Sequence, residues 1–472
     1  MVSSTFEVDP DDRVHFVGAG GVSMSALAAL HLEEGGQVTG SDITKNSRIT
    51  NLLEKGADIS IGHKPENIDD QDLLVKSTAI PEGNSEVQQA AEKGIPVISR
   101  AEFLAGLAAD KKQIAVSGTH GKTTTTAMLT EIFLRAGRDP SVMLGGELIS
   151  AESNHISGEE EHFIFEADES DGSLVYYSPW LAIITNLEAE HLNFYEDEIE
   201  IADKMKEFIN RIESGGFLIL CSDDPLIRTQ IKPYAEKRDI NIITYGINSG
   251  DYKADQVKTK NFKTSYQFKI ENKNVSRDMR VNLPGRCSVL NSLAAAAAAR
   301  AAGVDWNAIE DGLDNFKGVK RRFEVKGMVD DIQVIDDYAH HPTEIFATYL
   351  TAARSEPSRI ITIFQPHRFT RTRALWSDFV CTLSRIDYLL VCDIYPANQK
   401  PIEGINSRRL IEEIKKEKGS SNGWTKYSGT PQEAADFLLD RLDGGDLVLT
   451  LGAGDVYKAG ETLLEKMRGR ED

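Results

Sequence analysis

The stretch that decides the fold is QIAVSGTHGKTTTTAMLTEIFLRAG, residues 113–137. Its apolar start predicts a strand that ends at Gly118, and the segment from Lys122 onward has the apolar spacing of a helix that stops at Gly137. Backbone amides between such a strand and helix bind anions, Lys122 can reach the outer phosphates of a nucleotide, and the Thr123 hydroxyl can hold a metal ion. The stretch therefore predicts a phosphate-binding loop.

This loop is a short variant of the general phosphate-loop pattern. The pattern G-x-x-x-x-G-K-[ST] requires glycine at position 116, where this chain has Val116. A glycine-rich turn with a solvated lysine is the alternative interpretation. The strand before the loop and the helix after it favour the phosphate site.

Short apolar runs alternate with helical patterns along the rest of the chain, which indicates parallel α/β layers. We expect three domains: a Rossmann-like domain over residues 1–110, a central P-loop ATPase α/β domain over 111–319 and a Rossmann-like α/β domain over 320–472. The polar, Lys-rich residues 250–284 predict a small antiparallel insertion, and Asn291 is expected to begin an alanine-rich helix.

Acidic residues follow two of the apolar runs in the central domain. The run EADESD, residues 166–171, places Glu166 at the end of the predicted strand HFIF. Such a carboxylate can complete a Mg²⁺ site beside a bound nucleotide, because magnesium prefers oxygen ligands. The run LAIITN is followed by Glu190 and His191, at the matching end of its strand. A solvated acidic loop and a structural histidine are the alternatives.

The first domain has its own glycine-rich loop. Gly18, Gly20 and Gly21 follow the predicted strand RVHFV, and Asp42 follows the next strand. The third glycine of the dinucleotide fingerprint is missing, because Ser23 stands there. The loop therefore indicates a phosphate near the first helix and a hydroxylated ring near Asp42, without specifying a nicotinamide cofactor.

The third domain gathers charged side chains where parallel strands end, which is where ligands of such sheets bind. Arginines and histidines in clusters of this kind pair with carboxylates and phosphates; a solubilising basic patch is the alternative. The residues concerned are Arg321, Arg322, Asp336, Asp337, His340, His341, His367, Arg368, Arg371, Arg373, Asp393 and Asp455.

The composition narrows the possible functions. The chain has 472 residues and a formal net charge of -21, so a nucleic-acid surface is not expected. No run of residues is long and apolar enough for a membrane helix, and the acidic N-terminus is unlike a signal peptide. The four cysteines form no C-x-x-C pair. We therefore expect a cytoplasmic protein, either a monomer or a homodimer.

The chain resembles the Mur ligases of peptidoglycan synthesis over nearly its whole length. Ordered motifs carry the resemblance, and no single one of them would be enough: HFVGAGGVSMS, GSD, STAI, GTHGKTTTT, EADESDGS, ITNLEAEHLNFY, PGRCSVLNSLAA, VKRRFE, DDYAHHPTEI, FQPHRFTRT and LGAGD. Among these ligases, the motifs are most similar to those of the members that add L-alanine to UDP-N-acetylmuramate.

The resemblance implies which residues act. The residues implied for ATP binding are Gly118, Thr119, His120, Gly121, Lys122, Thr123, Thr124, Asn291, Arg322 and Asp337. Those implied for Mg²⁺ binding are Thr123, Glu166 and His191. The UDP-sugar is expected to contact Gly18, Gly20, Gly21, Ser41, Asp42 and Ser77, and the amino acid is expected to contact Tyr338, His367, Arg368 and Arg371. The catalytic group implied is Lys122, His191, His340 and Arg368.

The implied reaction moves the γ-phosphoryl group of ATP onto the carboxylate of UDP-N-acetylmuramate, after which the amine of L-alanine attacks the acyl phosphate. Three alternatives remain open: a recycling ligase that attaches a tripeptide to the same sugar nucleotide, a nicotinamide-dependent dehydrogenase and a non-catalytic nucleotide-binding module. The chain departs from the family pattern at Val22 and Ser23 in the first loop and at Asn193, where aspartate is usual.

Overall fold

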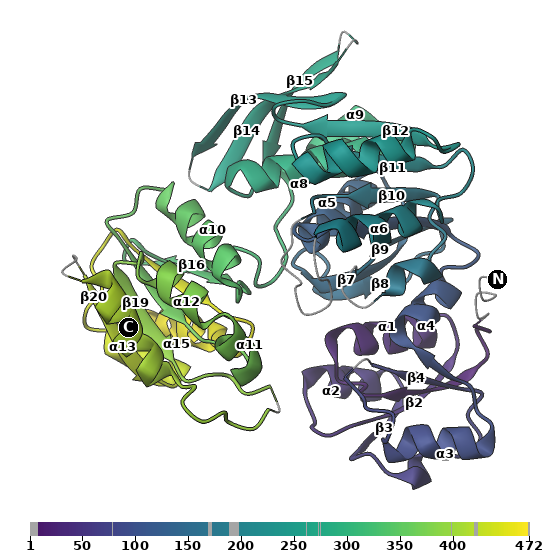
Figure 1. Ribbon diagram of the computed structural model, residues 1–472, viewed down its shortest axis with the longest axis horizontal. Coiled ribbons are helices and arrows are strands. Elements are labelled where there is room, and N and C mark those ends of the chain that lie inside the picture. The colour runs from purple at the N-terminus through teal and green to yellow at the C-terminus, as the bar shows by residue number, and fades with distance from the viewer. Residues whose placement is uncertain are drawn as a thin grey trace. The chain divides into compact units, whose positions relative to one another are not determined.

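The computed structural model describes residues 8–77, 79–168, 172–187, 198–260, 262–271, 273, 275–397, 399–419 and 423–470. These residues form three sheets with helices packed on them, the α/β architecture expected from the sequence (Figure 1). The first two sheets belong to one compact unit and the third sheet to another. No helix in these ranges is both long and apolar enough to cross a membrane.

The first sheet is parallel and has the strand order β3-β2-β1-β4-β5. The chain therefore reverses its winding direction between β1 and β4, and ligands of open α/β sheets bind at such switch points. Its strands are β1 (Arg13–Val17), β2 (Gln37–Asp42), β3 (Asp58–Ile61), β4 (Leu73–Lys76) and β5 (Val97–Ser99). Its helices are α1 (Val22–Glu33), α2 (Ser47–Glu54), α3 (Ser85–Lys93) and α4 (Arg100–Leu107).

The central sheet has ten strands in the order β15-β14-β13-β12-β11-β10-β6-β9-β7-β8. The strands are β6 (Lys112–Ser117), β7 (Ser141–Leu148), β8 (Ser153–Ile156), β9 (His162–Glu166), β10 (Leu181–Ile184), β11 (Phe217–Cys221), β12 (Asn241–Gly246), β13 (Tyr252–Lys260), β14 (Lys263–Ile270) and β15 (Val275–Val281). The helices are α5 (Lys122–Arg135), α6 (Glu198–Ile209), α7 (Lys232–Ala235), α8 (Gly285–Ala301) and α9 (Trp306–Asp314).

Two local predictions for the central domain need correction. The expected insertion is antiparallel only in part: β14 and β15 pair antiparallel, but β13 pairs parallel with β12, so the three strands extend the central sheet (Figure 1). The alanine-rich helix α8 begins at Gly285 rather than at Asn291. Its early start was missed because Pro284-Gly285 is a typical turn sequence.

The third sheet has the order β16-β17-β21-β18-β19-β20, with β16 antiparallel at one edge. Its strands are β16 (Glu324–Val329), β17 (Ile332–Asp337), β18 (Arg359–Phe364), β19 (Tyr388–Cys392), β20 (Trp424–Gly429) and β21 (Asp446–Leu451). Its helices are α10 (Pro342–Ala353), α11 (Phe369–Ala374), α12 (Trp376–Leu383), α13 (Ser407–Lys418), α14 (Pro431–Leu438) and α15 (Tyr457–Arg468).

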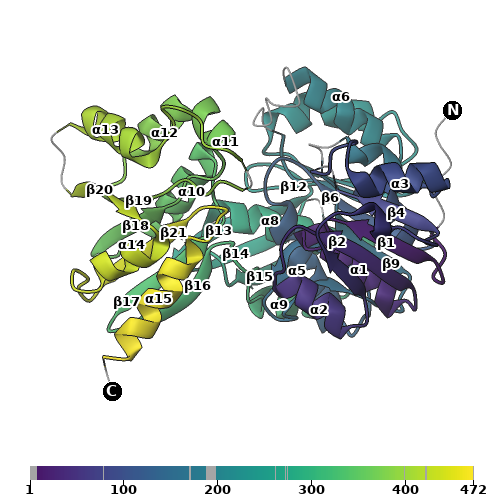
Figure 2. The same ribbon diagram turned by 90° about the horizontal axis from the view of Figure 1, so that it is seen from below.

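Helices cover both faces of the third sheet. Helices α10, α12 and α13 cover one face, and α14 and α15 cover the other (Figure 2). The buried strands β18 (RIITIF) and β21 (DLVLTL) are therefore mainly apolar, as expected for parallel strands with two covered faces. Polar groups are left for the strand ends, where the candidate site lies.

Candidate active site

The predicted phosphate loop connects β6 to the N-terminus of α5. Gly118 has φ +122°, and a Cβ atom there would overlap Thr185 Oγ1; Gly121 has φ +82°. Both positions therefore favour glycine. The Lys122 ammonium donates to the carbonyl oxygens of Gly118 (2.6 Å) and Thr119 (3.3 Å), so it lies over the loop at the start of the helix. This loop can bind an anion through its amides, the helix N-terminus and the lysine.

Two residues after β10 hold the loop, and the sequence interpretation did not assign them a role. The Asn186 side chain accepts from His120 N and donates to His120 O, each at 2.9 Å. The Thr185 hydroxyl donates to His120 O (2.6 Å), and Asn186 O accepts from Thr119 N (3.0 Å). In the sequence, the polar residues at the end of LAIITN were the signal that this strand end could carry functional groups. In the structure, they reach the phosphate loop because β10 and β6 are parallel neighbours.

A carboxylate lies beside the first turn of α5. The Thr123 hydroxyl donates to Glu166 Oε2 at 3.0 Å, and Gly145 N donates to Glu166 Oε1 at 2.6 Å. A threonine hydroxyl and a carboxylate at this separation are suitable oxygen donors for Mg²⁺. Within the described ranges, no three His, Cys, Asp or Glu side chains form a metal-binding group. His191, the third predicted ligand, lies outside those ranges, as do Glu190 and Asn193.

Helix α8 brings Asn291 against the phosphate loop. A Cβ atom built on Gly121 would lie 2.5 Å from Asn291 Oδ1, so the asparagine side chain contacts the loop glycine directly. Asn291 lies within the helix, six residues beyond its first residue, Gly285. The structure therefore brings three of the predicted nucleotide-binding segments together: the loop, the end of β9 and α8.

The glycine loop after β1 is held by the end of β2. Ser41 O accepts from Gly18 N (2.8 Å) and from Ala19 N (3.0 Å), and Asp42 Oδ2 accepts from Gly20 N (2.9 Å). A Cβ atom on Gly18 would come within 4.0 Å of the Ser77 side chain, which follows β4. Gly21 is the N-cap of α1. The residues predicted for the UDP-sugar thus lie together at the switch point of the first sheet.

In the second unit, Asp337 ends β17 and is almost completely buried. Its carboxylate accepts from Phe323 N and from Ala339 N, both at 2.7 Å. Burial raises the pKa of Asp337 to about 6, although the charge of Arg322 and the two amides act in the opposite direction. The neighbouring Asp336 serves the fold, because Arg321 donates to it and to the carbonyls of Gly452 and Gly454.

His340 follows the same strand. Its Nδ1 lies 3.0 Å from Tyr338 O, and a carbonyl oxygen can only accept. The proton of the neutral ring is therefore on Nδ1, which leaves the Nε2 lone pair available as an acceptor. Burial lowers the pKa of His340 to about 4, with a further lowering by the charge of Arg371, so the ring is neutral at pH 7. Glu344, which the sequence interpretation did not single out, accepts from His340 N at 3.1 Å.

His367 follows β18 and has the opposite arrangement. Arg371 Nη1 lies 3.2 Å from His367 Nδ1, and a guanidinium can only donate, so the proton of the neutral ring is on Nε2. Burial and the charge of Arg371 lower the pKa of His367 to about 3. The ring stacks on Tyr395 at 5.5 Å, and its centroid is 6.2 Å from that of His340. Arg368, with φ +72°, is the N-cap residue of α11.

The structure thus brings Tyr338, His340, His367 and Arg371 together, with Arg322 over the Tyr338 ring at 5.5 Å. Arg373 is exposed, and Asp393 is bonded by the Tyr427 hydroxyl. Asp455 accepts from Gln365, and His341 caps α10. In this structure Arg373 is therefore a surface residue, and Asp393, Asp455 and His341 make hydrogen bonds within the fold.

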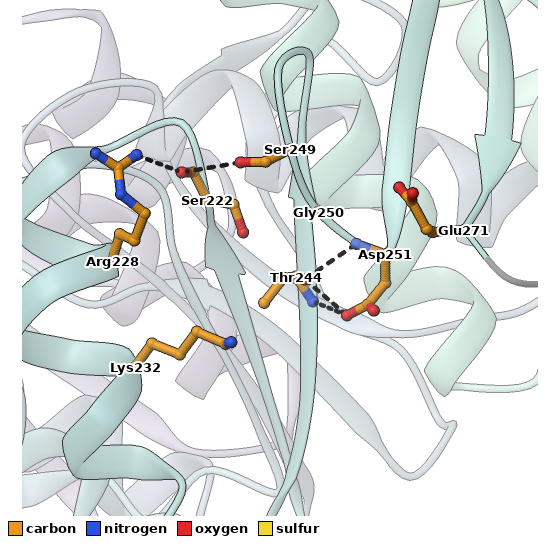
Figure 3. Close-up of a pocket in the computed structure, with 8 residues that line it drawn as sticks. All are labelled: Ser222, Arg228, Lys232, Thr244, Ser249, Gly250, Asp251 and Glu271. Carbon is orange, nitrogen blue, oxygen red and sulfur yellow. Dashed lines mark hydrogen bonds between the residues drawn. The ribbon is translucent and has the colours of Figure 1, made fainter.

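A polar pocket of about 340 Å³ lies at the ends of β11 and β12 (Figure 3), and its lining includes none of the predicted site residues. Its lining combines two cations with two carboxylates, so it has no clear preference for a charged ligand. The residues are Ser222, Arg228, Lys232, Thr244, Ser249, Gly250, Asp251 and Glu271.

Family models match all three parts of the chain that carry these groups. The Mur ligase family catalytic domain matches residues 13–112, the Mur ligase middle domain matches 116–299, and the Mur ligase glutamate ligase domain matches 321–454. The chain belongs to the Mur ligase family. It is therefore an ATP-dependent ligase with the three-domain Mur ligase architecture, which confirms the fold class and the resemblance drawn from the sequence.

Relatives within the Mur ligases are similar along nearly the whole chain. The UDP-N-acetylmuramate–L-alanine ligase of Geotalea uraniireducens (strain Rf4) is 42% identical over 459 residues, 97% of this chain and 98% of that protein. The ligase of the same name from Clostridium tetani (strain Massachusetts / E88) is 42% identical over 455 residues, with 96% and 98% covered.

Solved Mur ligase structures have the same fold. UDP-N-acetylmuramate-alanine ligase MurC from Thermotoga maritima superposes with a TM-score of 0.82 at 27% identity, covering 97% of this chain and 100% of that one. A murein peptide ligase from Psychrobacter arcticus 273-4 gives 0.70 at 25% identity, covering 97% and 98%.

Proposed function

We propose that this chain joins L-alanine to the carboxylate of UDP-N-acetylmuramate, with conversion of ATP to ADP and phosphate. The observation that carries the proposal is 42% identity, over nearly the whole chain, to ligases of that name. The phosphate loop, the Thr123–Glu166 pair and the histidine–arginine cluster supply the side chains that such a reaction needs.

In the first step, a carboxylate oxygen of the sugar nucleotide attacks the γ-phosphorus of ATP, and the bond to the ADP oxygen breaks. Charge spreads over the phosphoryl oxygens as it moves, so fixed cations and amide donors lower the barrier. Lys122 and the loop amides are placed for this, with Asn291 against the loop. Thr123 and Glu166 would hold Mg²⁺, which would supply further positive charge there when bound.

In the second step, the amine of L-alanine attacks the acyl phosphate carbon, and phosphate leaves. We propose that Arg368 and Arg371 bind the carboxylate of L-alanine, since guanidinium groups bind carboxylates through paired hydrogen bonds. His340 Nε2 accepts a proton from the amine as the C–N bond forms. A base of low pKa suffices at that stage, because the attacking nitrogen becomes strongly acidic once it is bonded to carbon. His367 Nε2–H donates to an oxygen of the reacting group.

The test is phosphate release with ATP, Mg²⁺ and UDP-N-acetylmuramate, with L-alanine, glycine, L-serine or the murein tripeptide as the amine, and with mass analysis of the product. We expect release that requires L-alanine and a sugar nucleotide heavier by one alanyl unit. Release with the tripeptide alone would instead make the chain a recycling ligase. Without any amine-dependent release, the substrate assignment would be wrong.

The metal proposal has its own test. We expect Glu166→Gln to raise the Mg²⁺ concentration needed for half-maximal activity, because it removes a charged oxygen ligand. Glu159→Gln, in an exposed turn, is the matched control. An unchanged Mg²⁺ requirement in Glu166→Gln would contradict the assignment. We also propose a cytoplasmic location, since Cys221, Cys381 and Cys392 are free thiols, as is typical of a reducing compartment.

A further inference from the structure

A buried carboxylate under the first glycine loop has no part in the reaction steps proposed above. Glu86 lies in the first turn of α3, and its side chain is 0% exposed. A buried ionised group is costly unless other groups bind it, so its retention at a strand-end site requires an explanation.

Donors converge on both oxygens of this carboxylate. Ser41 Oγ donates to Glu86 Oε2 at 2.6 Å, and His63 Nδ1 lies 3.0 Å from the same oxygen. Asn67 Nδ2 donates to Oε1 at 2.5 Å, and Lys64 N donates to it at 3.3 Å. His63 Nδ1 also lies 2.8 Å from Ser41 Oγ. Because an ionised carboxylate can only accept and the Ser41 hydroxyl donates to it, His63 Nδ1 carries a proton that both of these oxygens can accept.

These contacts keep the carboxylate ionised. Burial alone would raise the pKa of Glu86, but interactions with His15, Ser41 and Asn67 lower it to about 2. Several donors around one carboxylate favour its ionised form. Glu86 therefore binds together the end of β2, the loop after β3 and the turn at Pro65–Asn67.

The connection to the glycine loop runs through Ser41. The backbone oxygen of Ser41 accepts from Gly18 N and Ala19 N, while its hydroxyl donates to Glu86. Asp42, the next residue, accepts from Gly20 N through its side chain and from Gly62 N through its backbone. The position of the loop amides thus depends on a residue that Glu86 holds in place.

We propose that Glu86 is a positioning residue for the sugar nucleotide: it fixes Ser41, and through Ser41 the Gly18–Gly20 loop that binds the diphosphate. This inference rests on the proposed function, because it takes that loop as the UDP-sugar site. Glutamate suits the role better than glutamine. A glutamine would have the same shape, but its amide nitrogen is a donor and would replace one of the two accepting oxygens. That nitrogen would then face other donors, either those of Ser41 and His63 or those of Asn67 and Lys64.

The test compares Glu86→Gln with the wild type in the full-length chain. We expect the Kd for UDP, measured by titration calorimetry, and the KM for UDP-N-acetylmuramate to rise about tenfold, since a charge-assisted hydrogen bond is lost. The KM values for ATP and L-alanine should stay within about twofold, because Glu86 has no role at those sites. The matched control is Glu102→Gln, since that carboxylate bonds Ser99 N at the start of α4 in the same domain.

Further variants separate positioning from folding. Ser41→Ala should also raise the Kd for UDP. The double variant Ser41→Ala with Glu86→Gln should have a UDP Kd no higher than that of the weaker-binding single variant, because the two substitutions break the same connection. Glu86→Asp, which keeps the charge, should recover part of the affinity. Additive effects of Ser41 and Glu86, equal changes in all three KM values, or no UDP binding by the wild type would overturn the proposal. Intact UDP binding without alanine-dependent release would overturn the proposed function alone.

Discussion

Asn186 offers a direct test of how the phosphate loop is held. Its side chain makes two hydrogen bonds to the backbone of His120, each 2.9 Å long. Asn186→Ala removes both, and a neutral hydrogen bond contributes about 1 kcal/mol, so the ordered loop should lose about 2 kcal/mol. If ATP binds only the ordered loop, that loss raises the ATP Kd by up to roughly 30-fold.

The assay is titration calorimetry with a non-hydrolysable ATP analogue, together with thermal unfolding of the same samples. Asn241→Ala is the matched control, because the Asn241 side chain also donates to two backbone carbonyls, those of Gly215 and Gly216, but at the opposite end of the sheet. We expect both variants to unfold at lower temperature and only Asn186→Ala to lose ATP affinity. Equal ATP affinity in the two variants would refute the idea that Asn186 orders the loop.

Three further predictions follow from the same geometry. Gly121→Ala should abolish ATP binding and lower the free energy of unfolding by about 1–3 kcal/mol, because the new Cβ atom would lie 2.5 Å from a side-chain oxygen of α8. Gly137 also has a positive φ, +71°, but a Cβ atom there would have no neighbour within 4 Å, so Gly137→Ala should keep its ATP affinity in the same calorimetric assay. Burial raises the pKa of Asp337 to about 6, so its contribution to stability is fully present below about pH 4 and is lost as the pH rises through 6. The free energy of unfolding can be measured with urea for the wild type and for Asp337→Asn. The wild-type value minus the variant value should fall by about 1 kcal/mol between about pH 5 and 7. Arg371→Ala should raise the KM for L-alanine about tenfold or more by loss of a charged hydrogen bond, whereas the exposed Arg373→Ala should not, as measured by phosphate release.

The strand ends were predictable from the sequence for a simple physical reason. In a parallel α/β sheet an apolar run has to stop where the chain leaves the core, so Glu166 and Asp337 could be placed at the ends of β9 and β17 from the sequence alone. The same rule located the phosphate loop after β6. It could not locate Glu86, because that residue lies in a polar helical turn and its burial depends on segments 19 to 45 residues away.

Contacts that depend on neighbouring strands were missed. The side chain of Asn186 reaches the phosphate loop because β10 pairs with β6, and residues 66 positions apart in the sequence show no pattern that reveals this pairing. Strand β13 was included in a small antiparallel insertion because residues 250–284 are polar, alternating and rich in lysine. Its first residues in fact pair parallel with β12, so the sheet simply continues.

His340 and His367 show where residue type stops being informative. In the sequence they are alike: each follows an apolar run and has a charged residue nearby. In the structure, the Tyr338 carbonyl places the proton of His340 on Nδ1, and Arg371 leaves Nδ1 of His367 without one. One ring therefore presents an acceptor and the other a donor from Nε2. The proposed mechanism uses both, an acceptor for the amine proton and a donor for the oxygen that gains charge. The carbonyl beside His340 and the guanidinium beside His367 set these two states of one residue type.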